Sequence, residues 1–373
     1  MARVLYVATS DIHLNTFHRP YLEWLAAQGH SIDIAVENRS DHRFDSVSRS
    51  FSVTFPRTVW TWKHLIALRE LRRIIDAGRY DLLHCHTPIP SALTRFAARR
   101  FRQRGGKVLY TAHGFHFHRG GPVRNWLTYF PVEYLLASNT DGVVTINRED
   151  LLHARRMPFN RSYLIPGVGV DNARFRPVSL AERTRIRRSL GLDGDAFILF
   201  YVAEFIPRKN HKFIVSTGQL LQARIPNLRI LFVGTGRLFG AVQKQIARQN
   251  LDGLIECLGF REDVPRLAAI ADVGISSSRR EGLGLGVAEQ MMCAVPVVVS
   301  SDKGHAELVE HGVNGFLYPQ GDANKFVDYI DRLYTGEDLR AVMGRAAQLK
   351  AEQFSVEHSL AAMARIYNEL LGK

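Results

Sequence analysis

The apolar residues of this chain gather in short runs, and segments with helical spacing of apolar residues separate these runs. RVLYVAT (3–9) and SIDIAVE (31–37) are rich in strand-forming residues. Between them, a polar loop leads into PYLEWLAAQG (20–29), which has a helical pattern. Further strand-like runs follow helical segments at 81–87, 107–113 and 141–147. This alternation predicts a parallel, doubly wound sheet.

A stretch rich in proline and glycine, IPGVGVDNARFRP (165–177), interrupts the alternation and is predicted to be a linker. The alternation restarts with apolar runs at 197–204, 228–234, 254–260, 272–278, 296–300 and 315–319. A length of 373 residues fits two domains. We predict an N-terminal domain (1–170), a C-terminal domain (171–354) and a final helix (355–373) that packs back on the first domain. Ligands are expected in the cleft between the domains, outside the carboxyl ends of the strands.

The composition is that of a soluble globular protein, with 46% hydrophobic and 23% charged residues. Three cysteines in so long a chain argue against a disulfide framework and for a reducing compartment. No run of about 18 apolar residues is present, and the first apolar run is shorter than the core of a signal peptide. The sequence therefore predicts a cytoplasmic protein.

The formal net charge of +13 is concentrated in the first half of the chain. Residues 1–178 contain 25 Lys and Arg against 14 Asp and Glu, whereas residues 179–373 contain 24 against 22. Nucleic acid, an anionic membrane surface or a phosphorylated substrate would each suit this excess, and so would a solvated helix surface. The basic helical segments are 64–79, 91–107 and 151–156.

Candidate chemistry follows several of the predicted strands. Arg208 and Lys209 are adjacent in EFIPRKN, where their charge and reach suit a phosphate or diphosphate. Taken alone, the motif would be better interpreted as an ordinary basic loop. GTGRLFG (234–240) is a Gly-x-Gly turn that opens a helix, and it could admit a nucleotide or simply be a tight turn.

EGLGLGVAEQMMCAVPVVVS (281–300) contains two carboxylates around a cluster of glycines. Glu281 is predicted to lie in a loop, and Glu289 about one turn inside a short helix. The amides near Gly284 and Leu285 would then form a helix N-terminus that attracts a diphosphate. The two acids would bind sugar and ribose hydroxyls. The plainer reading is a loop that only starts a helix.

Histidines cluster in TAHGFHFHRGG (111–121), where His113 stands at the end of a predicted strand. A metal site made of His113, His116 and His118, with the histidines of HCH (84–86), is not favoured. No carboxylate ligand lies nearby in the sequence, and the spacing matches no zinc pattern. DGD (193–195) resembles a metal-binding Asp-x-Asp, but it precedes its strand instead of following it. We therefore predict no metal and no other cofactor.

Together these motifs resemble glycosyltransferase family 4, the retaining nucleotide-sugar transferases of the GT-B fold, over essentially the whole chain. The family's Glu-x7-Glu pair is matched by Glu281 and Glu289, and its PRKN lysine by Lys209. LGFREDV (258–264) matches another family segment. HTPIPSALTRFAARR, with YTAHGFHFHRGGPVRNWLTYFPVE, resembles the branch that serves bacterial capsule, exopolysaccharide and lipopolysaccharide synthesis. The resemblance implies an α/β protein with two Rossmann-like doubly wound domains facing a central cleft.

The resemblance also implies how the donor is bound. The first domain would bind the acceptor, and the second domain the nucleotide-sugar donor, for which a UDP-sugar is expected. Lys209, helped by Arg208, would neutralise the diphosphate, and Arg261 would lie beside the base. The amides of Gly284 and Leu285 would hold phosphate.

The same resemblance implies the catalytic residues. Glu289 would bind the ribose, Glu281 the hydroxyls of the transferred sugar, and His113 the sugar near its reacting carbon. Transfer would be front-face: the acceptor hydroxyl attacks from the side of the leaving group, and the donor phosphate takes its proton. This chemistry depends on charge stabilisation more than on a protein nucleophile.

Two departures from the family pattern concern the ligands. Glu204 stands where the family commonly has arginine, so one diphosphate cation is missing. ATSDIHLNTFHRP replaces the usual glycine pair after the first strand, and Asn15 and His18 within it are candidates for the acceptor pocket.

The expected acceptor of this branch is a sugar on a polyprenyl diphosphate. Anionic lipid at the inner face of the plasma membrane would attract the basic helices at about 1 kcal/mol per well-placed charge. A peripheral membrane enzyme is thus expected. The alternatives are a GT-B sugar-nucleotide epimerase and a basic nucleic-acid-binding protein. The latter is disfavoured because the basic runs lack the interleaved, stacked aromatic residues that bind nucleic-acid bases.

Overall fold

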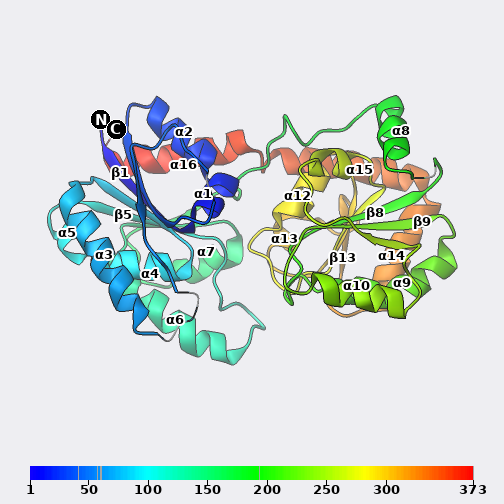
Figure 1. Ribbon diagram of the computed structural model, residues 1–373, viewed down its shortest axis with the longest axis horizontal. Helices are drawn as coiled ribbons and strands as arrows, with labels where there is room; N and C mark the ends of the chain where they lie inside the picture. The colour runs from blue at the N-terminus through cyan, green and yellow to red at the C-terminus, as the bar shows by residue number, and fades with distance from the viewer. Residues whose placement is uncertain (41, 57, 59–60, 193, 373) are drawn as a thin grey trace. The chain divides into compact units, whose positions relative to one another are not determined.

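The computed structural model describes residues 1–40, 42–56, 58, 61–192 and 194–372, and the chain divides into two compact units (Figure 1). The first unit contains Met1–Gly169 and the C-terminal segment that starts at Val356. The second contains Val170–Ser355. The chain segments that enter and leave the second unit lie side by side, because Val170 pairs with Ser355.

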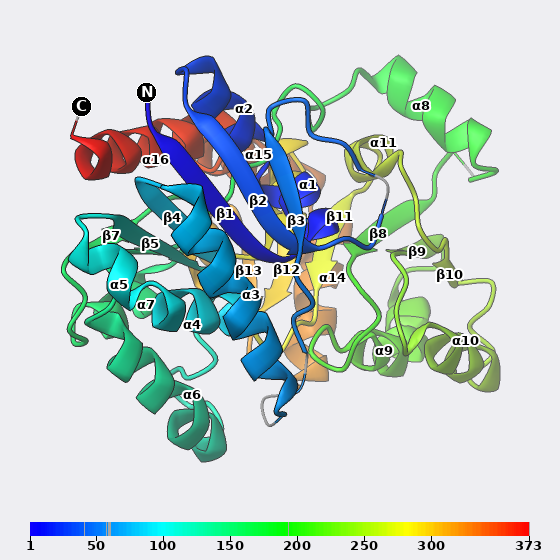
Figure 2. The same ribbon diagram turned by 60° about the vertical axis from the view of Figure 1, so that its left-hand side comes forward.

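The first unit is built on a seven-stranded parallel sheet with the order β3-β2-β1-β4-β5-β6-β7. Figure 2 shows α3 and α4 in front of this sheet, and α16 packed beside α2. The strands are β1 (Arg3–Ser10), β2 (Ser31–Glu37), β3 (Arg49–Ser52), β4 (Leu82–His86), β5 (Lys107–Ala112), β6 (Gly142–Thr145) and β7 (Ser162–Leu164). The helices are α1 (Asp11–Phe17), α2 (Arg19–Ala27), α3 (Lys63–Gly78), α4 (Pro88–Ala97), α5 (Arg99–Gln103), α6 (Val123–Ala137), α7 (Arg148–Ala154) and α16 (Val356–Leu371).

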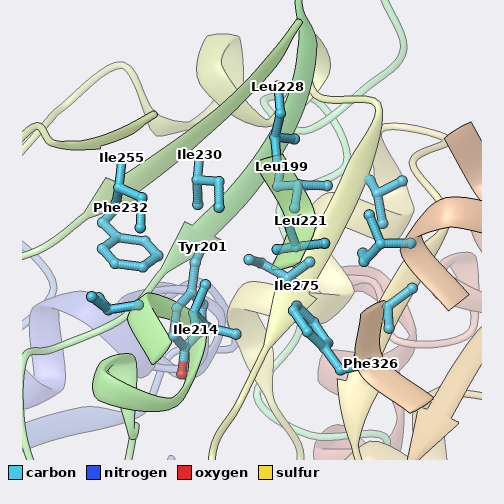
Figure 3. Packing of buried hydrophobic residues seen from close by; sticks show 14 of the residues in the cluster. Leu199, Tyr201, Ile214, Leu221, Leu228, Ile230, Phe232, Ile255, Ile275 and Phe326 are labelled. Atoms are coloured by element: carbon cyan, nitrogen blue, oxygen red, sulfur yellow. The ribbon is translucent and has the colours of Figure 1, made fainter. Parts of the chain in front are cut away.

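The second unit is a six-stranded parallel sheet with the order β10-β9-β8-β11-β12-β13. Alternate residues of its strands, such as Leu199 and Tyr201 on β8 and Ile230 and Phe232 on β9, point into one core (Figure 3). The strands are β8 (Phe197–Val202), β9 (Leu228–Val233), β10 (Ile255–Cys257), β11 (Val273–Ser276), β12 (Val297–Ser300) and β13 (Gly315–Tyr318). The helices are α8 (Leu180–Ser189), α9 (His211–Arg224), α10 (Phe239–Arg248), α11 (Val264–Ala269), α12 (Leu285–Met292), α13 (His305–Leu308), α14 (Ala323–Thr335) and α15 (Glu337–Glu352).

The predicted α/β architecture with two doubly wound sheets is confirmed, and every predicted strand is present, most of them shorter than predicted. The prediction of a polar loop after the first strand is wrong, because residues 11–17 form the helix α1. The Ser10 side chain caps this helix by accepting a hydrogen bond from the His13 amide at 3.3 Å. The segment 91–107 is divided between α4 and α5. Within the described residues, none of the helices is long and apolar enough to cross a bilayer.

Candidate functional site

The carboxyl ends of β8 and β11 lie next to each other, at the point where the strand order of the second unit reverses. Open α/β sheets bind ligands at this position. The loop after β8 carries Arg208 and Lys209, and the loop after β11 carries Glu281. Lys209 Nζ lies 2.6 Å from Glu281 Oε1, and Arg208 Nη1 lies 3.2 Å from Glu281 Oε2. The structure thus joins three predicted site residues in one ionic cluster.

The charge of this cluster follows from the state of Glu281. Burial opposes its ionisation, but the charges of Lys209 and Arg208 outweigh burial and lower the pKa of Glu281 to about 2. The carboxylate is therefore ionised at neutral pH. Two cations around one anion leave a net charge of +1, which attracts an anionic ligand.

Backbone contacts fix the two loops against each other. The Tyr201 hydroxyl donates to the carbonyl of Lys209 at 2.6 Å, and the Ser277 hydroxyl donates to the carbonyls of Lys209 and Asn210 at 3.1 and 3.0 Å. The Arg279 amide donates to the carbonyl of Arg208 at 2.8 Å. Side chains from β8 and from the end of β11 therefore hold the lysine backbone in place, a rigid base for a charged group.

The helix α12 begins at Leu285, as predicted, and its N-cap is Gly284 with a φ of 100°. Only glycine adopts this backbone conformation without strain. Within the described residues, no side chain caps this N-terminus. At Gly286, glycine is required for lack of space. An added Cβ would lie 2.9 Å from Val202 Cγ1 and 3.0 Å from the Val202 carbonyl oxygen. The helix therefore packs directly on the end of β8, beside the ionic cluster.

Glu289 lies one turn inside α12, as predicted, and is half-buried. Its carboxylate has no hydrogen-bond or ion-pair partner among the described residues. Burial raises the pKa of Glu289 to about 7, although Arg174 and Lys209 act in the opposite direction. An unpaired carboxylate of this kind is available to accept hydrogen bonds from a ligand.

His305 was missed in the sequence, although it follows the strand 296–300 as the other site residues follow theirs. It is buried and lines a small pocket with Lys209, Glu281 and Gly284. Its Nδ1 contacts the carbonyl of Ser300 at 2.7 Å, and its Nε2 is buried without a partner in the described structure. Burial opposes protonation, but the neighbouring Asp302 raises the pKa of His305.

Two other predicted positions have local partners. The guanidinium of Arg261 forms a two-bond pair with Asp263, at 2.7 Å for each bond. In the Gly-x-Gly turn, a Cβ on Gly234 would lie 2.2 Å from the carbonyl oxygen of Ala203. The second glycine, Gly236, likewise presses on the backbone after β8. The tight-turn interpretation of this motif therefore suffices.

In the first unit, His113 follows β5 and lies among other histidines. Its Nε2 is 3.4 Å from His86 Nδ1, and its ring centroid is 5.1 Å from those of His13 and His18. Burial, together with the neighbouring histidines, holds the pKa of His113 well below its usual value. Its imidazole is therefore neutral at pH 7.

Of the other residues predicted in the first unit, some lie beside His113 and some do not. His18 is buried beside His113, whereas Asn15 Oδ1 accepts from Arg19 on the surface of α1 at 3.0 Å. His116 stacks on Tyr129, and Nδ1 of His118 lies 3.0 Å from the carbonyl oxygen of Arg119. Residue 193 of DGD lies outside the described residues.

Comparisons with known proteins identify the class. A model described as "Glycosyl transferase 4-like domain" matches residues 15–166, and one described as "Glycosyl transferases group 1" matches residues 182–350. A protein of Bacillus subtilis (strain 168) that is named as a glycosyltransferase, EpsD, is 38% identical over 368 residues, covering 98% of this chain and 96% of the relative. An Escherichia coli protein named UDP-Gal:alpha-D-GlcNAc-diphosphoundecaprenol alpha-1,3-galactosyltransferase is 26% identical over 322 residues, covering 83% and 81%.

Solved structures agree on the fold. Anabaena Alr3699/HepE, in complex with UDP and glucose, superposes with a TM-score of 0.80 at 21% identity, covering 99% of this chain and all of the other. WaaG, a glycosyltransferase involved in lipopolysaccharide biosynthesis, gives 0.78 at 14% identity, covering 97% and 99%. The protein is therefore a glycosyltransferase of the GT-B fold. Within that class it belongs to the group 1 glycosyltransferases of family 4, which confirms the resemblance drawn from the sequence.

Proposed function

We propose that the protein is a retaining glycosyltransferase of bacterial surface polysaccharide synthesis. It moves a hexosyl or N-acetylhexosaminyl group from a nucleotide-sugar, most simply a UDP-sugar, to a glycan on a polyprenyl diphosphate. The observation that carries this proposal is the net positive cluster of Arg208, Lys209 and Glu281 beside the uncapped start of α12.

The donor diphosphate would lie against the two cations and the first amides of α12. Lys209 and Arg208 then share their contacts between Glu281 and the phosphates. Glu281 is ionised and fixed, so it can accept hydrogen bonds from hydroxyls of the transferred sugar. The unpaired Glu289 suits a ribose diol, because a carboxylate can accept two hydrogen bonds at once. His305, with an unpartnered Nε2 in the same pocket, adds a donor for the phosphate or the sugar.

The chemistry then needs no protein nucleophile. As the bond between the sugar carbon and the phosphate oxygen breaks, the acceptor hydroxyl forms a new bond on the same face. Its proton passes to the departing phosphate. The negative charge that develops on the diphosphate is stabilised by Lys209, Arg208 and the helix amides, which are already in position. His113 is assigned to the sugar near its reacting carbon.

The acceptor side rests on the first unit and its surface. The Escherichia coli relative is named for an acceptor on diphosphoundecaprenol. On α6, Val123, Leu127 and Leu135 are 71%, 74% and 72% exposed and lie at helical spacings of four and eight. This apolar ridge lies on the helix that packs beside α4, in the basic half of the chain. Apolar insertion combined with arginines suits an anionic bilayer, so we assign the protein to the inner face of the plasma membrane.

Transfer of sugar from a donor panel to a lipid-linked acceptor tests the activity. Lys209→Ala is expected to lower turnover about 100-fold or more, in line with the loss of one preorganised charge contact. The matched control is Lys212→Ala, an exposed lysine three residues along. Equal activity of the two variants would refute the site. Epimerisation of the donor without transfer would instead favour the epimerase alternative.

Flotation with vesicles tests the membrane assignment separately. Leu127→Glu is expected to reduce binding to anionic vesicles, while activity on a soluble acceptor analogue is retained. Equal binding of the wild-type protein to neutral and anionic vesicles would contradict the electrostatic part of the assignment.

A further inference from the structure

The ring of His305 has one nitrogen with partners and one without. Its Nδ1 lies 2.7 Å from the carbonyl oxygen of Ser300 and 3.0 Å from Oδ2 of Asp302. A carbonyl oxygen can only accept a hydrogen bond, so Nδ1 carries a proton whether the ring is neutral or charged. The proton that the ring gains or loses is therefore the one on Nε2. Nε2 is buried and has no hydrogen-bond partner among the described residues.

The unpaired nitrogen lies against the start of α12. A Cβ added to Gly284, the N-cap of this helix, would lie 3.0 Å from Cδ2 and 3.4 Å from Nε2 of His305. No side chain in the described part of the chain caps this helix end. The helix N-terminus and the ring nitrogen thus meet at one place, and Lys209 and Glu281 line the same pocket. The helix amides attract an anion, and Nε2 does so only when it carries a proton.

Asp302 and Ser300 fix the direction of the ring. Oδ1 of Asp302 accepts hydrogen bonds from the amides of Gly304 and His305 at 2.6 and 3.3 Å, which holds the carboxylate beside the ring. The hydroxyl of Ser300 donates to the carbonyl of Ser278 at 2.5 Å, which joins the end of β12 to the loop after β11. Because Nδ1 is held by these two residues, Nε2 has a fixed direction before any ligand binds.

The charges around the ring favour its protonated form. Burial opposes protonation, but Asp302 and Glu281 outweigh burial and raise the pKa of His305 above the ordinary value of 6.5. Lys209, which lines the same pocket, acts against protonation. Tyr201 also lines it and is neutral, since burial raises its pKa to about 12. The negative charge of a bound diphosphate would favour the protonated ring further.

We propose that His305 binds the donor diphosphate as an imidazolium, through Nε2–H, and that Asp302 is the positioning residue that keeps it in this form. The proposal rests on the proposed transferase function, and it supplies a cation in place of the one that is absent at Glu204. Donor affinity is then controlled by pH through a single proton. Below the pKa of His305, Nε2–H donates to a phosphate oxygen. Above it, Nε2 presents a lone pair that repels the same oxygen.

Binding of UDP to the full-length protein, measured by isothermal titration from pH 6.5 to 9.5, tests the proposal. His305→Asn keeps a donor at the position of Nδ1 but removes the one at Nε2. We expect this variant to bind UDP about 10-fold or more weakly than the wild-type protein at pH 6.5, the loss of a hydrogen bond to a charged group. The affinity ratio of the two proteins should shrink as pH rises, because the wild-type ring loses its Nε2 proton. Titration of UDP and of Glu289 affects both proteins and cancels in this ratio.

Two further variants test the roles of the proton and of the carboxylate. His305→Gln, whose amide reaches the position of Nε2, should restore most of the affinity that His305→Asn loses at pH 6.5, and should bind UDP more tightly than the wild-type protein at pH 9.5. Asp302→Asn should move the decline of the wild-type affinity to lower pH, because the pKa of His305 falls without the carboxylate. His311→Asn, at an exposed histidine six positions along, is the control and should bind UDP normally.

The outcomes separate this proposal from the proposed function. An affinity ratio between the wild-type protein and His305→Asn that stays constant with pH would overturn the proposal and leave the ring a structural role. Equal affinity of these two proteins would overturn it as well. If circular dichroism shows that His305→Asn does not fold, the comparison of His305→Gln with the wild-type protein at the two pH limits gives the same test. Absence of UDP binding to the wild-type protein at every pH would instead overturn the proposed UDP-sugar site, and this proposal with it.

Discussion

Glu289 offers a direct test of the proposed donor site, because a carboxylate that is buried without a partner lowers the stability of the fold but remains available to a ligand. Its carboxylate is half-buried in α12, lacks a partner among the described residues, and has a pKa raised to about 7 by burial. Replacing it with glutamine keeps the shape and removes the charge. We expect Glu289→Gln to be more stable than the wild-type protein at pH 8 and to bind UDP more weakly.

The magnitude and its sign follow from proton linkage. Between the ordinary carboxyl pKa of 4.5 and the raised value of about 7, the folded state binds more protons at Glu289 than the unfolded state does. The free energy of unfolding therefore falls as pH rises through this window. The full cost is at most about 3.5 kcal/mol above pH 7, at about 1.4 kcal/mol for each pH unit of the window. Below pH 4.5 this cost is absent.

The assay is urea unfolding followed by circular dichroism at pH 4.5 and pH 8. Tryptophan fluorescence is unsuitable, because all four tryptophans lie before residue 127, outside the second unit. Glu262→Gln, at an exposed position of the same unit, is the control and should have little effect at either pH. The reasoning is refuted if Glu289→Gln gives no gain at pH 8, or the same gain at both pH values.

One further substitution in each unit tests how its residues pack. Gly286→Ala is expected to destabilise the second unit by about 1–2 kcal/mol in urea unfolding, since the new Cβ would press on Val202. Gly240→Ala in α10, where an added Cβ meets nothing within 4 Å, should be neutral or stabilising, and a reversed order would contradict the packing argument. Glu133→Ala is expected to destabilise the first unit by about 3–5 kcal/mol by tryptophan-detected unfolding, because it leaves the buried guanidinium of Arg95 unpaired. A loss below 1 kcal/mol would show that this pair is dispensable.

The sequence predicted those strands whose residues are buried on both faces. SIDIAVE (31–37) has the bounds of β2, because five consecutive buried positions leave a clear apolar run. The short edge strands β3 and β7 were not predicted. Their sequences, RSFS and SYL, are mostly solvent-accessible, and these strands are defined by their pairing with a neighbouring strand. The helix α1 was not predicted, because its polar residues, including Asp11, indicated a loop. The N-cap residue Ser10 was not used as a helix signal.

In the proposed donor site, the sequence predicted which residues lie close together but not how they pair. Arg208, Lys209 and Glu281 were each placed after a strand, and parallel strands bring such positions together. That Glu281 pairs with both cations depends on side-chain geometry across more than 70 residues of sequence. The pair between Arg261 and Asp263 is different: the two residues are two positions apart, and a local contact of this kind could have been anticipated.

The histidines show why sequence distance misleads at such a site. The motif TAHGFHFH directs attention to His116 and His118, which are close to His113 along the chain. Neighbouring side chains of an extended segment point to different sides. His116 contacts Tyr129, and His118 contacts the backbone of Arg119. In a doubly wound sheet the neighbours of a strand end are the ends of the adjacent strands. For His113, at the end of β5, these are the end of β4 and, one strand further, the segment after β1. The residues to examine with His113 are therefore those about 27 and 100 positions earlier, His86 and His13, because sheet order decides which side chains meet.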